Sequence, residues 1–209
     1  MDQELYEVFK ERNKQLLINS LNYDIDRNIT SMLESMANVF NYEFSAAKKN
    51  IRQIYEDAKI KDTEFVIVII DTLKVDSYRE LERLLDIRRQ DLEAANELMT
   101  LDEENMKEYY DYITATTKLL LYDLKKAMTN NLQKEVLKKL NKMISKEKNI
   151  ENKELLLSRI EEYITNRLFG KLESKIQTEL STRDANLVNK AGEGYLRYLK
   201  LCSKTEELL

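Results

Sequence analysis

An all-α fold, built as an elongated multi-helix bundle with coiled-coil-like heptad packing, is predicted by the composition and by the spacing of apolar residues. Proline is absent and glycine occurs three times among 209 residues, whereas average usage would give about ten prolines and about fifteen glycines. Sheets and irregular loops use both residues at turns, so their scarcity argues against a β-rich chain. Charged residues make up 34%, above the roughly 25% of an average domain, which suits long helices that face solvent.

The clearest apolar repeat begins at Ile25. Its members follow one another at steps of three and four, with one additional step of four that makes a stutter: Ile25, Ile29, Met32, Met36, Phe40, Phe44, Ala47, Ile51, Ile54 and Ala58. This spacing predicts a helix from about Asp24 to Ile60, with Asp24 as its N-cap. Phe40 and Phe44 flank the stutter and are expected to be buried. A further helix is expected before it, over about Glu4–Ser20.

Two more repeats follow. The first is spaced 3-4-3-4-3-4 and contains Tyr78, Leu81, Leu85, Arg88, Leu92, Ala95 and Met99. The second is spaced 4-3-4-3-4-3 and contains Met106, Tyr110, Ile113, Thr117, Leu120, Leu124 and Ala127. Ser77 with Glu80, and Thr100 with Glu103, have the spacing of capping boxes, which predicts where these two helices begin. Additional apolar residues widen the faces beyond a two-stranded seam and favour a bundle: Leu84, Ile87, Leu98, Leu119 and Leu121.

The C-terminal third predicts helices over about Asn131–Lys146 and Asn152–Leu180 from the same kind of spacing. Gly170 lies inside the second of them and indicates a kink or a close helix crossing. A short helix is expected after residues 181–182. The glycines of residues 192–194 are then expected to break the chain before a last helical segment.

One element is ambiguous. Residues Phe65–Ile70 form a wholly apolar, largely β-branched run that is typical of a strand. The chain contains no second such run to pair with it, and a lone strand would leave its backbone groups unsatisfied. A buried helix is therefore favoured, with a strand as the alternative. This longest apolar run is far shorter than the roughly 20 residues of a membrane span, so no membrane partner is expected.

Catalytic and metal-binding residue types are scarce. Histidine is absent and Cys202 is the one cysteine, which excludes Ser-His-Asp, Cys-His and ordinary zinc sites within this chain. Glu104, Glu108 and Asp111 share one helix face that could hold Mg²⁺, but a solvated face with acids near a helix N-terminus is the preferred interpretation. We expect no catalytic residue, no metal site and no cofactor. Cys202 is expected to be a partly buried residue of a terminal helix.

Charge divides the chain. Residues 1–117 carry 15 Lys+Arg against 25 Asp+Glu, and residues 118–204 carry 19 against 11. We expect an acidic helical portion at 1–128 and a basic helical portion at 129–209, packed as one continuous domain. Lysines at every fourth residue of the basic portion form a lysine stripe, the candidate partner-binding site: Lys134, Lys138, Lys142 and Lys146. Apolar residues lie on the other side of the same predicted helix, so this stripe is expected to face solvent.

These features predict a non-enzymatic protein that binds other proteins, including copies of itself. A structural assembly component and a small regulator or inhibitor both fit. The alternative is a nucleic-acid-associated protein that uses the basic C-terminal half, although the lysine stripe lacks the arginines and interleaved aromatic residues that such sites favour. The acidic N-terminus is unlike a secretion signal, so a cytoplasmic location is expected. Size and composition are similar to those of helical adaptor, scaffolding or inhibitory proteins of phages and AT-rich bacteria.

Overall fold

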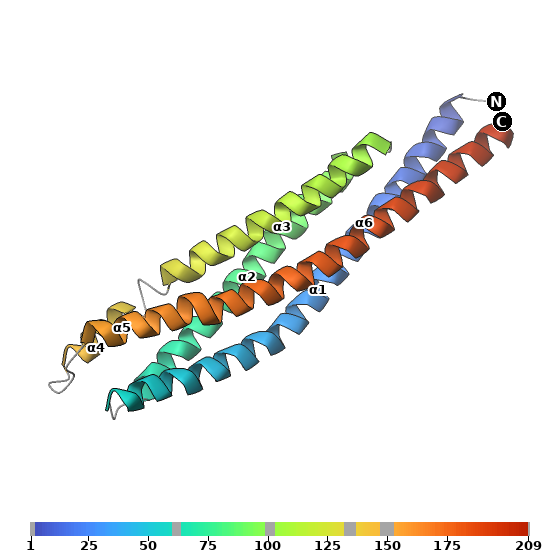
Figure 1. The fold of residues 1–209 in the computed structure, drawn as a ribbon. Coiled ribbons are helices and arrows are strands. Elements are labelled where there is room, and N and C mark those ends of the chain that lie inside the picture. The colour runs from blue at the N-terminus through green and yellow to red at the C-terminus, as the bar shows by residue number, and fades with distance from the viewer. Residues whose placement is uncertain (1–2, 60–63, 99–102, 132–136, 147–152, 209) are drawn as a thin grey trace. The chain divides into compact units, whose positions relative to one another are not determined.

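The computed structural model describes residues 3–59, 64–98, 103–131, 137–146 and 153–208, and all regular structure in these ranges is helical (Figure 1). The all-α prediction is therefore confirmed, while the elongated shape and the heptad packing stay predictions. Along the chain the elements are α1 (Gln3–Asp57), α2 (Glu64–Leu98), α3 (Glu103–Asn131), α4 (Lys138–Ile144), α5 (Lys153–Glu162), the π-helical segment η2 (Tyr163–Leu168) and α6 (Phe169–Leu208). None of the described helices is both long and apolar enough to cross a membrane.

The helices contribute to two compact units. Unit 1 comprises Met1–Met32, Leu85–Lys118 and Glu179–Leu209, and unit 2 comprises Leu33–Leu84 and Leu119–Thr178. Each of α1, α2, α3 and α6 contributes one segment to each unit, whereas α4, α5 and η2 belong to unit 2. Both units are thus built from segments that are distant in sequence. The division by charge into residues 1–128 and 129–209 follows a different criterion and stays a prediction.

Helix α1 contains the strongest predicted repeat and extends beyond it toward the N-terminus. The first eight members of that repeat are buried: Ile25, Ile29, Met32, Met36, Phe40, Phe44, Ala47 and Ile51. Phe40 and Phe44 stack with ring centroids 5.8 Å apart, so their predicted burial is confirmed. The predicted helix start at Asp24 is wrong, because no glycine or proline interrupts the chain there and the Asp24 carboxylate pairs with Lys190. The helix expected over Glu4–Ser20 is therefore the first part of α1.

The ambiguous run Phe65–Ile70 is helical and belongs to α2. Within it, Ile69 and Ile70 are buried, whereas Val68 is exposed. The predicted helix is therefore confirmed for the run, and the predicted burial is confirmed for Ile69 and Ile70. A helix satisfies its own backbone groups, so this run needs no partner strand.

The capping box predicted at Ser77 is wrong, because α2 begins thirteen residues earlier, at Glu64. Ser77 is fully buried within the helix, and its hydroxyl has no hydrogen-bond partner among the described residues. Glu80 instead accepts hydrogen bonds from Arg83 Nε at 2.9 Å and Nη2 at 2.6 Å. The other predicted cap, Thr100, lies outside the described residues. Capping spacing alone therefore misplaced the start of α2.

Helix α3 shows where a predicted repeat is displaced by one residue. Tyr110, the predicted member, is 52% exposed, and its neighbour Tyr109 is 5% exposed. The central members of the repeat are buried as predicted: Ile113, Thr117, Leu120 and Leu124. Among the residues expected to widen the faces, Leu84 is buried, but the following are exposed: Ile87, Leu98 and Leu119. The apolar spacing fits Tyr109 and Tyr110 equally well, so only the packing of α3 against its neighbours decides which of the two is buried.

The chain is continuously helical from Lys153 to Leu208. The predicted helix Asn152–Leu180 is thus confirmed in position, but the predicted restart after residues 181–182 and the predicted break at residues 192–194 are wrong. A glycine inside a helix costs about 1 kcal/mol relative to alanine, a cost that packing along a long helix offsets. A Cβ at Gly170 would meet nothing within 4 Å, so no close crossing occurs there.

Unit 2 is packed around aromatic and aliphatic side chains of α1 and α2. Tyr78 meets Phe40 edge to face, with ring centroids 5.4 Å apart. A buried carboxylate lies nearby on α1, where Glu43 faces Lys171 Nζ at 3.7 Å and Lys175 Nζ at 3.9 Å. These contacts join the segments of α1, α2 and α6 that belong to this unit.

Candidate interaction surface

In unit 1, α1 and α6 run antiparallel, and the beginning of α1 lies beside the end of α6 (Figure 1). Three contacts define the alignment: Asn28 with Arg183, Asp24 with Lys190, and Leu17 with Gly194. A Cβ at Gly194 would overlap Leu17 Cδ1. Glycine therefore permits the two helices to approach closely at this level.

A groove runs between these two helices. Apolar residues that line it are Leu16, Leu17, Leu21, Tyr198 and Leu201. Polar and charged residues line it as well, namely Asn13, Ser20 and Asp24 from α1 and Lys190, Glu193 and Arg197 from α6. A groove lined by both kinds of residue can receive an amphipathic helix.

Basic residues follow the α6 edge of this groove. Arg197 lines the groove, and Lys200 and Lys204 follow it three and seven residues later on the same helix face. All three are exposed, and none forms an ion pair with another described side chain. Lys190, by contrast, is paired with Asp24. We call Arg197, Lys200 and Lys204 the basic rim.

The first turns of α1 also expose apolar side chains. Leu5 is 57% exposed, Val8 65% and Leu16 58%. A shallow hollow on this side of the helix is lined by Val8, Glu11, Arg12, Gln15 and Leu16. Exposed apolar residues that share a helix face with charged neighbours are typical of protein interaction sites.

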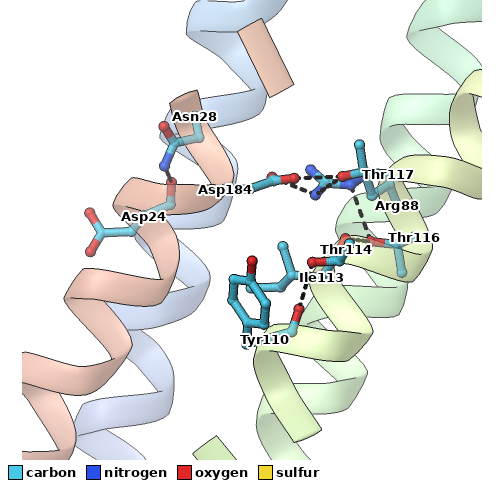
Figure 2. A network of polar contacts seen from close by, with 9 residues as sticks. All are labelled: Asp24, Asn28, Arg88, Tyr110, Ile113, Thr114, Thr116, Thr117 and Asp184. Carbon is cyan, nitrogen blue, oxygen red and sulfur yellow. Dashed lines mark hydrogen bonds and ion pairs between the residues drawn. The ribbon is translucent and has the colours of Figure 1, made fainter. Parts of the chain in front are cut away.

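A buried ion pair joins three helices inside unit 1 (Figure 2). Arg88 on α2, 4% exposed, donates from Nη2 to Asp184 Oδ1 on α6 at 2.6 Å. The same guanidinium donates to Thr117 Oγ1 at 3.0 Å and to Thr116 Oγ1 at 3.3 Å, both on α3. Thr117 Oγ1 in turn donates to Asp184 Oδ2 at 2.5 Å. This network aligns α2, α3 and α6 and satisfies the buried charges.

Tyr109 on α3 is affected by the same network. Burial raises the pKa of Tyr109 to about 12, against the opposing effects of the Arg88 charge and a hydrogen bond with Asn96. Asn96 also donates from Nδ2 to Asn22 Oδ1 at 2.7 Å, which joins α2 to α1. The interior of unit 1 therefore contains a layer of polar side chains from all four of its helices.

The predicted lysine stripe is described in part. Lys138 and Lys142 lie on α4 and Lys146 lies in the turn after it, and all three are exposed. Lys134 lies outside the described residues. The helix predicted over Asn131–Lys146 falls partly on residues 132–136, which lie outside the described residues; within the described part, Asn131 is the last residue of α3 and α4 covers Lys138–Ile144. Exposure agrees with the predicted solvent-facing stripe, while its role in binding stays a prediction.

Other candidate groups are also placed by the structure. Cys202 is buried in α6, and burial, followed by the neighbouring Cys202 thiol, raises the pKa of Tyr198 to about 12. Glu108 and Asp111 are exposed on α3, whereas the Glu104 side chain lies outside the described part. Among the described residues, no three Cys, Asp or Glu side chains converge as metal ligands would.

Comparison with protein-family models, with curated proteins and with solved structures gives no match to this chain. The candidate surface therefore rests on geometry alone. Sequence reasoning missed the groove, because it depends on which residues of α6 lie against α1. Two signals were present: basic residues at Arg197, Lys200 and Lys204, and a charged residue, Arg88, inside an apolar repeat.

Proposed function

We propose that this chain is a non-enzymatic helical interaction protein of the cytoplasm, an assembly component or small regulator that binds other proteins, including copies of itself. The observation that carries this proposal is the groove between α1 and α6, with its apolar lining and with a basic rim that forms no ion pair among the described side chains. Leu5 and Val8, exposed beside it, add apolar surface that water covers in a single copy. Such surface favours association through the hydrophobic effect.

The buried polar groups support the same proposal. The Arg88 guanidinium and the Asp184 carboxylate bind each other and two threonines, a use that fits alignment of helices better than proton transfer. A general acid or base must instead reach a substrate with a proton to exchange.

Light scattering across a concentration series tests the proposal. The mean mass should rise with protein concentration at about 0.1 M salt and should fall toward the monomer near 1 M salt if charge orients the contact, because the Debye length shrinks from about 10 Å to about 3 Å. A mass that stays monomeric at every concentration would contradict self-association. Retention on heparin that modest salt abolishes, together with a constant mass, would favour the nucleic-acid alternative.

The lysine stripe is a second candidate contact within this proposal. Reversing the charge of its four members should weaken association without loss of helicity if the stripe binds an acidic surface: Lys134, Lys138, Lys142 and Lys146 to Glu. Circular dichroism of the same variant checks that the helices remain. An unchanged mass would place the contact elsewhere on the chain.

A further inference from the structure

We propose that the first turns of α1 from one copy bind in the α1–α6 groove of a second copy, so that the chain associates head to tail. This inference rests on the proposed self-association and names the surfaces that perform it. It requires two surfaces on unit 1 that are complementary in charge and apolar character and that cannot meet within one molecule.

The first surface is the groove with its basic rim. Apolar side chains line it, and Arg197, Lys200 and Lys204 on α6 are exposed without an ion pair among the described side chains. The α1 side carries the uncharged Asn13 and Ser20 together with Asp24, which is paired with Lys190, and Glu193 adds one acid on α6. An occupant should therefore be a helix that buries apolar side chains and presents acids on the side facing α6.

The second surface is an acidic stripe at the start of α1. Glu4, Val8, Glu11 and Gln15 are spaced 4-3-4 and lie on one helix face. All four are exposed, as are the adjoining Leu5 and Glu7. Apolar side chains between acids are what the groove requires. Arg12 borders the same face and Glu7 is paired with Lys10 at 3.6 Å, so the acidic character of this face comes mainly from Glu4 and Glu11.

These two surfaces lie largely on different sides of α1 and adjoin at Leu16, which lines both the groove and the hollow beside Val8. Four of the six α1 residues that line the groove, at positions 13, 17, 20 and 24, each lie nine residues beyond a member of the acidic stripe. Nine residues are about two and a half turns of an α-helix, which places the two sets about 180° apart. One copy therefore cannot fill its own groove with its own stripe. Contact between different surfaces of two copies is heterologous, and it builds rings or open chains.

The two surfaces also match in length. The stripe and the α1 side of the groove each extend over twelve residues, which is about 18 Å of helix. Charge on exposed residues orients such a contact, and the apolar side chains hold it. Leu5 and Val8 would enter the groove against Leu16 and Leu201, all of which are exposed in one copy.

Charge reversal on each surface tests this inference. A rim variant carries Arg197→Glu, Lys200→Glu and Lys204→Glu, and a stripe variant carries Glu4→Lys, Glu7→Lys and Glu11→Lys. Each should weaken self-association at least tenfold in a light-scattering concentration series at about 0.1 M salt. A matched control reverses three other exposed cations that form no ion pair among the described side chains, Lys49→Glu, Arg52→Glu and Lys126→Glu, and should associate as the unchanged chain does.

Mixing the two variants gives the decisive result. Each variant alone should associate at least tenfold more weakly than the unchanged chain, since its groove and its stripe then carry the same sign of charge. An equimolar mixture should associate again, because each groove meets a stripe of opposite charge. Circular dichroism should show equal helicity for all variants, since every substituted residue is exposed.

Three outcomes would overturn the inference. If the chain associates but the rim and stripe variants associate equally well, groove docking is wrong and the proposed function stands. If only the lysine-stripe variant loses association, the contact lies on that stripe, and again only the groove inference is wrong. If the unchanged chain is monomeric at every concentration, both the inference and the proposed self-association are wrong.

Discussion

The interiors of the two units differ in how they use polar groups. Unit 2 packs aromatic and aliphatic side chains, with Phe40 between Phe44 and Tyr78 at centroid distances of 5.8 and 5.4 Å. Its buried carboxylate, Glu43, faces two exposed lysines, Lys171 and Lys175. In unit 1, the interior contains a buried ion pair between Arg88 and Asp184 together with buried threonine and asparagine side chains. The units also differ in charge, since unit 1 carries 13 Lys+Arg against 20 Asp+Glu and unit 2 carries 21 against 18.

This difference shows two ways of aligning helices. Apolar side chains stabilise a bundle strongly but tolerate small shifts along the helix axis. A buried ion pair tolerates only a very small shift of one helix along another, because a shift that separates the two charges leaves each of them out of water without a partner. We therefore expect unit 2 to depend most on packing volume and unit 1 on the completeness of its polar contacts. The following substitutions test that comparison in order of decreasing effect.

Removal of the Phe40 ring should have the largest effect. Phe40 is 1% exposed and contacts two aromatic rings, so Phe40→Ala should lower the free energy of unfolding by about 3–5 kcal/mol. Urea denaturation followed by circular dichroism measures this loss. The control is Tyr42→Ala, since Tyr42 is 70% exposed on the same helix and should cost less than about 0.5 kcal/mol. A cost under about 1 kcal/mol at Phe40 would mean that packing volume does not dominate unit 2.

Removal of one charge from the polar layer should cost about 3 kcal/mol. Arg88→Met leaves the Asp184 carboxylate, which is largely buried, without its cation. The double variant Arg88→Met with Asp184→Leu should recover most of this loss, because apolar side chains of similar size do not require pairing. Thermal denaturation of both variants measures the difference. Equal losses in the single and the double variant would indicate that packing of these side chains matters more than their charge.

Alkaline pH should weaken unit 1 through Tyr109. Its pKa rises from 10.0 to about 12 on folding, mainly by burial, so the unfolded chain loses the phenol proton first as the pH rises. The resulting stabilisation is fully present below about pH 10 and is lost as the pH rises through about 12, a change of about 2–3 kcal/mol. Urea midpoints measured across this range should fall less steeply for Tyr109→Phe than for the unchanged chain.

Two glycines of the unit 1 segment of α6 should respond in opposite directions. A Cβ at Gly192 meets nothing within 4 Å, so Gly192→Ala should raise the free energy of unfolding by about 0.5–1 kcal/mol through helix propensity. A Cβ at Gly194 would overlap Leu17 Cδ1, so Leu17 has to move when Gly194 is replaced by Ala. This displacement should cost about 1 kcal/mol or more and cancel the gain in helix propensity. Denaturant midpoints of the two variants provide the measurement. A stabilising Gly194→Ala would show that Leu17 moves aside freely.

The chain by itself determined that the fold is helical and that the repeat from Ile25 to Ile51 is buried in α1; the last two predicted members, Ile54 and Ala58, are only partly buried, and Tyr55 is buried in their place. Proline absence and the repeat from Ile25 to Ile51 are local properties, since a 3.6-residue period places these residues on one face whatever packs against them. The aromatic pair Phe40 and Phe44 was predicted for this reason. Arg88 also fell within a predicted repeat, although its partner could not be predicted from spacing.

Tertiary structure alone decided where helices end, which neighbour is buried and which distant residues meet. Asp24 and Ser77 have the chemistry of caps, but Asp24 pairs with Lys190 and Ser77 is buried within α2, so local capping preference was overridden. The apolar spacing does not distinguish Tyr109 from Tyr110, and the packing of the neighbouring helices decides that Tyr109 is the buried one. Asp184 lies 67 residues from Thr117 and 96 residues from Arg88, the two side chains that it meets. The basic rim lies still further along the chain from the acidic stripe that it is proposed to meet. Such pairings depend on how antiparallel helices align, which is set by packing of the whole unit and leaves no periodic trace in the sequence.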